Sequence, residues 1–154
     1  MFIYYFVHLD LPFPEAERRL VGVVSGLDGM AVAAYREGEE LRARIGLGEP
    51  PVIAKTVRLE VGQPVAQGGT TVLPIVWEAT GTPGLFPRMD ADLVIAALGS
   101  GLTQLALRGL YSPPLGLIGR ALDKALLHRV AEASVKGFVD RIARALQAHQ
   151  ENGL

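Results

Sequence analysis

Hydrophobic and polar residues alternate along several stretches of the chain, with the period of two that half-buried strands show. The alternation predicts strands over residues 39–46, 51–62, 70–80, 90–99 and 102–111. Glycine- and proline-rich segments separate these strands, and residues 98–103 have the composition of a tight hairpin. Strands of this kind bury one face each, which is typical of an antiparallel sheet with one covered side.

The first part of the chain has a different pattern. Residues 2–9 are rich in aromatic and β-branched side chains and predict a strand that ends at the prolines of "DLPFP". Helical spacing follows, and Gly22, Gly26 and Gly29 divide it into two short helices over roughly 14–25 and 28–36.

A long amphipathic helix is predicted at the end of the chain, over residues 117–147, after Pro113 and Pro114 close the last strand. Its apolar stripe consists of Leu122, Leu126, Leu127, Val130, Ala131, Ser134, Val135, Phe138, Ile142 and Leu146. Steps of four overshoot the 3.6-residue turn, so the stripe winds around the helix, as a concave sheet that wraps a helix would require. Gly137 allows a close approach or a slight bend within this helix.

The strand pattern also predicts one shared apolar face. Its members are Ile53, Val57, Leu59, Leu73, Ile75, Trp77, Leu93, Ile95, Leu105 and Leu107. Such a face needs a cover, and the long helix is the one predicted element large enough to provide it. Whether side chains fill the space between sheet and helix decides between a core and a pocket.

Composition excludes several classes of function. Fifteen Lys and Arg against sixteen Asp and Glu give a net charge of -1, so nucleic acid is not an expected partner. The chain has no cysteine, which excludes disulfides and thiolate chemistry. No apolar run reaches the roughly 18 residues of a membrane span, and the opening residues lack the basic leader of a secretory signal. We expect one domain over 1–154, located in the cytoplasm, without integral membrane association.

A group of turn and packing residues carries a resemblance to a known family. They are Trp77-Glu78, Phe86-Pro87, Asp90, Tyr111, Pro113-Pro114, Gly116, Leu122-Asp123 and Arg129-Val130-Ala131-Glu132. With the order of elements, they resemble small uncharacterised bacterial members of the START and polyketide-cyclase-like (SRPBCC) superfamily. The match is closest over 77–146, and the first seventy residues match in element order alone.

The resemblance implies an α+β helix-grip fold, with a curved antiparallel sheet of about six strands around the C-terminal helix. It also implies a cavity for a small apolar molecule, such as a lipid, sterol, quinone or polyketide. We expect a monomer or homodimer. The predicted ligand-binding residues are Val57, Leu59, Leu73, Ile75, Trp77, Leu93, Ile95, Leu105, Leu107, Leu126, Val130 and Phe138. Trp77, the single tryptophan, either lines the bottom of the cavity or packs in the core.

Three side chains are weak catalytic candidates. Lys55 shares its parity with Val57, so it either faces an anionic group in the cavity, or forms a Schiff base there, or extends to water. His128 is a general base at the cavity mouth or a solvated helix residue. Tyr111 offers a hydroxyl for orienting a ligand, as do Tyr4 or Tyr5, or it is a half-buried strand aromatic.

Other chemistry has little support in the sequence. The three histidines form no i, i+4 pair, so no metal and no cofactor are predicted, and the signatures of nucleophilic hydrolases and phosphate-binding loops are missing. We therefore expect a carrier of a small hydrophobic molecule. A cyclase, aromatase or dehydratase that uses the same cavity is the first alternative, and a protein-interaction module with a filled core is the second.

Overall fold

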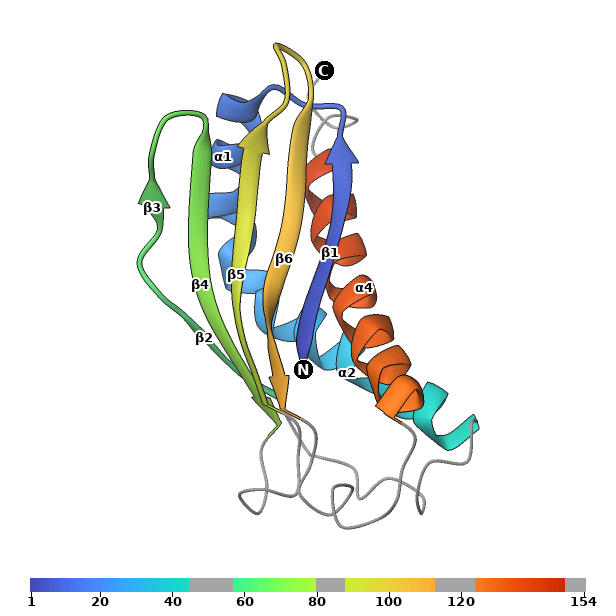
Figure 1. Cartoon of the computed structure of the whole chain (residues 1–154). Coiled ribbons are helices and arrows are strands. Elements are labelled where there is room, and N and C mark those ends of the chain that lie inside the picture. The colour runs from blue at the N-terminus through green and yellow to red at the C-terminus, as the bar shows by residue number, and fades with distance from the viewer. Residues whose placement is uncertain (45–56, 80–87, 113–123, 149–154) are drawn as a thin grey trace.

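A computed structural model describes residues 1–44, 57–79, 88–112 and 124–148 (Figure 1). In chain order, its elements are β1 (Phe2–Leu9), α1 (Phe13–Val23), the 3₁₀ turn η1 (Val24–Gly26), α2 (Leu27–Arg44), β2 (Val57–Val61), β3 (Val65–Ala66), β4 (Thr70–Ala79), β5 (Arg88–Ala97), β6 (Thr103–Ser112) and α4 (Lys124–Ala148).

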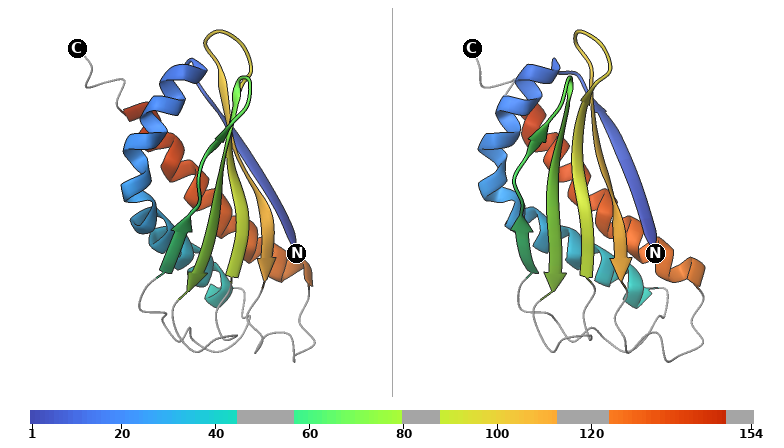
Figure 2. Two further views of the ribbon diagram at one scale, coloured as in Figure 1. Left: turned by 90° about the vertical axis from the view of Figure 1, so that its left-hand side faces the viewer. Right: turned by 60° about the vertical axis from the view of Figure 1, so that its left-hand side comes forward.

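The strands form a single antiparallel sheet in the order β1-β6-β5-β4-β2, and the short β3 also pairs with β4. All the described helices lie on one face of this sheet (Figure 2). Helix α4 runs along β1 and β6, while α1 and α2 approach β5 and β2. The predicted helix-grip-like α+β arrangement is confirmed, although within the described residues α1 and α2 share the cover with the long helix α4.

A two-residue turn joins β3 to β4. Gly68 and Gly69 have φ angles of 46° and 34°, and Gln67 N donates to Thr70 O over 2.9 Å. Positive φ at both central positions is the type I′ geometry that matches the twist of paired strands, and glycine adopts it without steric cost. The prediction treated this segment as part of a longer turn and missed β3.

Pro74 lies in the middle of β4, where a proline normally weakens a sheet. Its carbonyl accepts a hydrogen bond of 2.7 Å from Gly62 N, so its backbone faces the β2 side of the sheet. That position is opposite residues 62–64, between the end of β2 and the start of β3. The reciprocal bond, from an N–H at position 74 to Gly62 O, cannot form at a proline, so the pairing of β2 with β4 ends beside Pro74.

The predicted strand over residues 39–46 is wrong, because α2 continues to Arg44. The alternation of Leu41 and its neighbours is short, and packing against α4 decides the structure. A Cβ on Gly38 would overlap Ser134 Oγ, so the two helices meet at this glycine. Close by, Arg141 forms a hydrogen-bonded ion pair with Glu37. This hydrogen bond, despite partial burial, holds the pKa of Glu37 below its usual value.

The predicted division of the N-terminal helical segment into two helices is correct in position, but not all three glycines that were expected to cause it lie at the break. Of the three glycines expected to interrupt the helix, Gly26 lies in η1, whereas Gly22 and Gly29 lie inside α1 and α2. The expected close approach at Gly137 is confirmed, because a Cβ there would overlap Glu37 Oε2. Glycines in this chain therefore mark helix contacts as well as helix ends.

Candidate functional site

The inner face of the sheet, which the helices cover, consists of rows of side chains set by strand register. Leu59, Trp77, Met89 and Tyr111 are successive cross-strand partners and form the row nearest the end of β4. We call it the Trp77 row. The alternation in the sequence predicts correctly which side chains of β4 and β5 point inward, because every second residue of these strands is buried.

Further from the Trp77 row, the inner face is closed. Leu73, Leu93 and Leu107 form one row, and Ile95 pairs with Leu105 in the next. Apart from Leu73, at 3%, these side chains have 0% exposure. Ile142 and Leu146 of α4 are also at 0% and belong to the same apolar cluster. This end of the inner face is a packed core.

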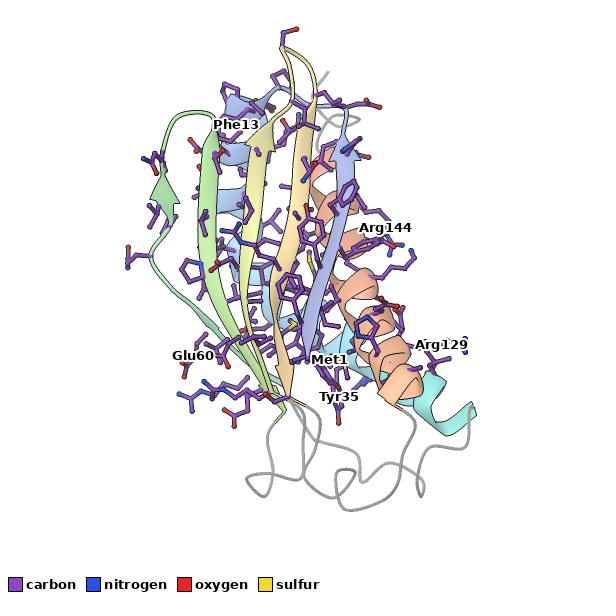
Figure 3. All side chains as sticks on the ribbon, in the orientation of Figure 1. Met1, Phe13, Tyr35, Glu60, Arg129 and Arg144 are labelled. Carbon is purple, nitrogen blue, oxygen red and sulfur yellow. The ribbon has the colours of Figure 1, made fainter. Side chains whose placement is uncertain are left out.

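At the Trp77 row burial is less complete. Trp77 is 5% exposed and Tyr111 9%, and Leu59 is partly buried. Phe138 of α4 lies against Trp77, with 5.4 Å between the ring centroids. Tyr35 of α2 is 7% exposed and lies towards the same end as Met1, as Figure 3 shows. Trp77 and Tyr111 therefore keep a small exposed aromatic fraction, whereas Met89 between them, at 2% exposure, is as buried as the side chains of the closed rows.

Polar groups on the described inner face are few and satisfied locally. Thr103 Oγ1 donates to Leu11 O over 2.7 Å, and Thr71 Oγ1 donates to Glu17. Ser134 Oγ contacts Val130 O at 3.3 Å within α4. No Asp, Glu, Lys, Arg or His is buried among the described residues. The face suits an uncharged, apolar occupant.

A polar cluster joins β1 to α4 beside this face. Tyr5 OH donates to Asp140 Oδ1 over 2.8 Å, and Lys136 Nζ lies 2.5 Å from Asp140 Oδ2. Burial would raise the pKa of Asp140, but hydrogen bonds from Lys136 and Tyr5 outweigh it and leave the pKa below its usual value. Burial, and then the bond to Asp140, raises the pKa of Tyr5. The cluster fastens the long helix to the edge strand.

The catalytic candidates are not gathered in one place. His128 Nε2 lies 2.9 Å from Glu132 Oε1 on an exposed part of α4. Tyr111 is buried in the Trp77 row, whereas Tyr4 is 49% exposed on the other face of the sheet. Lys55 lies outside the described residues.

The predicted ligand-binding set is only partly brought together. Leu59, Leu73, Ile75, Trp77, Leu93, Ile95, Leu105, Leu107 and Phe138 belong to or pack against one apolar cluster. Val130 is buried but lies outside this cluster, and the side chains of Val57 and Leu126 lie outside the described part. Sequence reasoning missed Met89 and Tyr35. The parity of β5 could have identified Met89, but Tyr35 depends on the path of α2.

Two further findings concern membranes and metals. Within residues 1–44, 57–79, 88–112 and 124–148, no helix is long and apolar enough to cross a membrane. In the same ranges, no three His, Cys, Asp or Glu side chains gather in a way that could hold a metal ion.

Comparisons with known proteins agree with the fold and go no further. No family model and no curated protein matches the chain. A conserved protein from Geobacillus kaustophilus has 13% identity and a TM-score of 0.50, with 95% of each chain covered, so the two share a fold. A hypothetical protein from Helicobacter pylori gives 0.48, at 12% identity and 92% and 87% coverage. An aromatase/cyclase from Streptomyces gives 0.31, at 12% identity and 97% of each chain. These two lower scores support no argument.

Proposed function

We propose that the protein binds and carries a small apolar molecule between the Trp77 row and the helices α2 and α4. The observation that carries the proposal is the difference in closure along the inner face. Leu93, Leu105 and Leu107 have 0% exposure, whereas Trp77 and Tyr111 keep 5% and 9%. Apolar surface that the chain itself does not cover is the usual lining of a ligand pocket.

The chemistry of the row indicates the class of ligand. Trp77 keeps aromatic surface exposed, the buried ring of Phe138 packs against it at 5.4 Å between centroids, and the neighbouring Met89 adds a polarisable thioether. Such surfaces favour flat or flexible hydrocarbon groups, and no buried charge among the described residues would bind an ionised head deep inside. A lipid chain, a quinone ring or a polyketide chain would satisfy this chemistry.

A cyclase, aromatase or dehydratase is the second candidate. The observation in its favour is that the buried titratable residues of the described part, Tyr35 and Tyr111, lie towards the end of the inner face where Met1 lies, since Tyr111 N donates to Met1 O and Tyr35 lies near Met1 in Figure 3. Hydroxyls there would act as proton donors to a bound chain. In a carrier, Tyr111→Phe should weaken ligand binding by no more than about tenfold, since one hydrogen bond contributes on the order of 1 kcal/mol.

The test uses the single tryptophan as a contact reporter. Because Trp77 is the only tryptophan, titration with 9,10-dibromostearate, a bromine quencher that acts near contact, reports binding beside its ring. We expect saturable quenching with one ligand per chain. Native mass spectrometry of the same sample should show the chain plus one ligand mass.

A matched control variant distinguishes binding beside Trp77 from binding on the outer face of the sheet. Leu110→Lys changes a side chain that is 57% exposed on the opposite face, so quenching of Trp77 should be unchanged. Absence of quenching by dibromostearate and by a brominated naphthoquinone, with only the bare chain in the mass spectrum, would refute the proposal.

A further inference from the structure

The outer face of the sheet, opposite the helices, carries an unusual amount of apolar surface. Phe6, Ala106, Val94, Val72 and Val65 are successive cross-strand partners and form one uninterrupted apolar row. An antiparallel sheet with one solvated side normally shows polar residues there. No described helix covers this face (Figure 2).

Aromatic side chains of β1 extend the row. Phe2 is 61% exposed, Tyr4 49% and Phe6 46%, and the rings of Tyr4 and Phe6 lie 5.8 Å apart. Leu110, the cross-strand partner of Phe2, is 57% exposed. Contiguous exposed apolar surface of this kind marks an interaction site.

The same face contains a recess beside these projections. A hollow of about 470 Å³ lies between outward side chains of β4, β5, β6 and the start of β1. Phe2 and Leu110 stand at its wall, with Pro74 and Val76 on the other side. A surface that carries both a projection and a recess can pack against a rotated copy of itself.

The charges of the outer face also favour a copy of the same surface. They are three arginines and four carboxylates, namely Arg58, Arg88, Arg108, Glu60, Glu78, Asp90 and Asp92. Most pair within the chain, at 2.9 Å for Arg58–Glu60 and 3.0 Å for Arg88–Asp90. Arg108 contacts Asp92 at 3.6 Å through Nε, and among the described residues it makes no other ion pair.

These charges decide between possible occupants. A nucleic acid or an anionic membrane would meet Asp90 and Asp92 at the hollow, which opposes binding. A second copy brings both an arginine and carboxylates, so Arg108 of each chain can pair across the interface.

The size of the face matches what a dimer needs. The strands β1, β6, β5, β4 and β2 have 8, 10, 10, 10 and 5 residues, which at about 3.3 Å per residue and about 4.8 Å between strands gives roughly 700 Å². A standard protein interface buries about 800 Å² per partner.

We infer that the outer face of the sheet binds the outer face of a second copy, which gives a homodimer of two sheets packed face to face. The sheets would lie about 10 Å apart, the usual distance for packed sheets. The inner faces and their helices then point away from the interface, so ligand binding at Trp77 does not depend on dimerisation.

Sedimentation velocity tests the inference directly. The wild-type chain should sediment at twice its 16.5 kDa mass. Leu110→Lys and Phe6→Lys each place a charge in the interface and should weaken the dimer at least tenfold, since a buried unpaired ammonium is costly. Val21→Lys is the matched control, because Val21 is 74% exposed on α1, on the helix side, and should leave the dimer intact.

Three results would overturn the inference. One is a wild-type protein that remains monomeric up to about 100 µM. Another is a dimer that both lysine variants retain while circular dichroism shows them folded. A monomer that co-sediments with phosphatidylcholine vesicles would replace the second copy by a lipid surface, and would equally count against the dimer.

Discussion

The two ends of the inner face are made from the same strands but are closed to different degrees. At the hairpin end, Leu93, Leu105 and Leu107 meet α1 and α4 and have no exposed surface. At the other end, Trp77 and Tyr111 remain slightly exposed beside α2 and α4. The comparison shows that the same strands are covered by different helices along their length, by α1 and α4 at one end and by α2 and α4 at the other, and only at the second end do we propose a binding surface.

Removing side chains from the two ends should have unequal costs. Leu93 and Met89 lie on the same strand and face the same side, at 0% and 2% exposure. Leu93→Ala should lower the free energy of unfolding by about 3–5 kcal/mol, whereas Met89→Ala should cost less than about 2 kcal/mol, because the proposed ligand space would lie beside Met89. Urea denaturation of both variants measures the difference. Equal losses would mean that the Trp77 end is packed as tightly as the hairpin end.

The crossing of α2 and α4 sets the width of the Trp77 end. A Cβ on Gly38 would overlap Ser134 Oγ, so Gly38→Ala should force the helices apart and cost about 1–3 kcal/mol in the free energy of unfolding. A Cβ added at Gly29 of the same helix would meet no other atom within 4 Å. Gly29→Ala should therefore stabilise the protein by up to about 1 kcal/mol. Thermal unfolding of the two variants should shift in opposite directions, and a shared direction would mean that the crossing does not set this width.

The smallest effect is expected from the Tyr5–Asp140–Lys136 cluster, which fastens α4 to β1. Because the pKa of Asp140 is lower in the folded chain, its contribution to stability is complete above the unfolded pKa of about 3.9 and is lost as the pH falls through the folded value. Asp140→Asn should remove up to about 1 kcal/mol at pH 7 and nearly nothing at the acid end of this window.

Urea denaturation of the parent and of Asp140→Asn at several pH values measures that contribution. Lys136→Met is the companion variant, since it removes the ammonium but keeps the carboxylate and Tyr5. A stability gap between parent and Asp140→Asn that stays constant from pH 7 to acid would contradict the assigned role of the carboxylate.

Much of the fold follows from local pattern. The alternation in β4, β5 and β6 correctly predicts which side chains turn inward, because a period of two leaves one choice of face once the apolar side is known. The stripe of α4 is equally clear, and Ala131, Val135, Ile142 and Leu146 are all at 0% exposure.

The errors lie where distant contacts decide. Residues 39–44 are helical although Leu41 and its neighbours alternate, because Gly38 and Glu37 meet α4 about one hundred residues later in the chain. Local pattern predicts only part of the candidate site. The alternation of inward and outward residues places Trp77 and Leu59 together. The difference in closure between the two ends depends on how α1, α2 and α4 share one face, and no local signal in the sequence predicts that.

The most direct test of the proposed binding place is whether open space exists beside Trp77. Crystals of the protein pressurised with xenon would show it, because xenon enters dry apolar cavities and leaves filled cores empty. We predict a xenon site bordered by Trp77, Met89, Tyr111 and Phe138, and none beside Leu93, Leu105 and Leu107. Xenon absent from the Trp77 row, or bound only in the hollow of the outer face, would contradict this prediction.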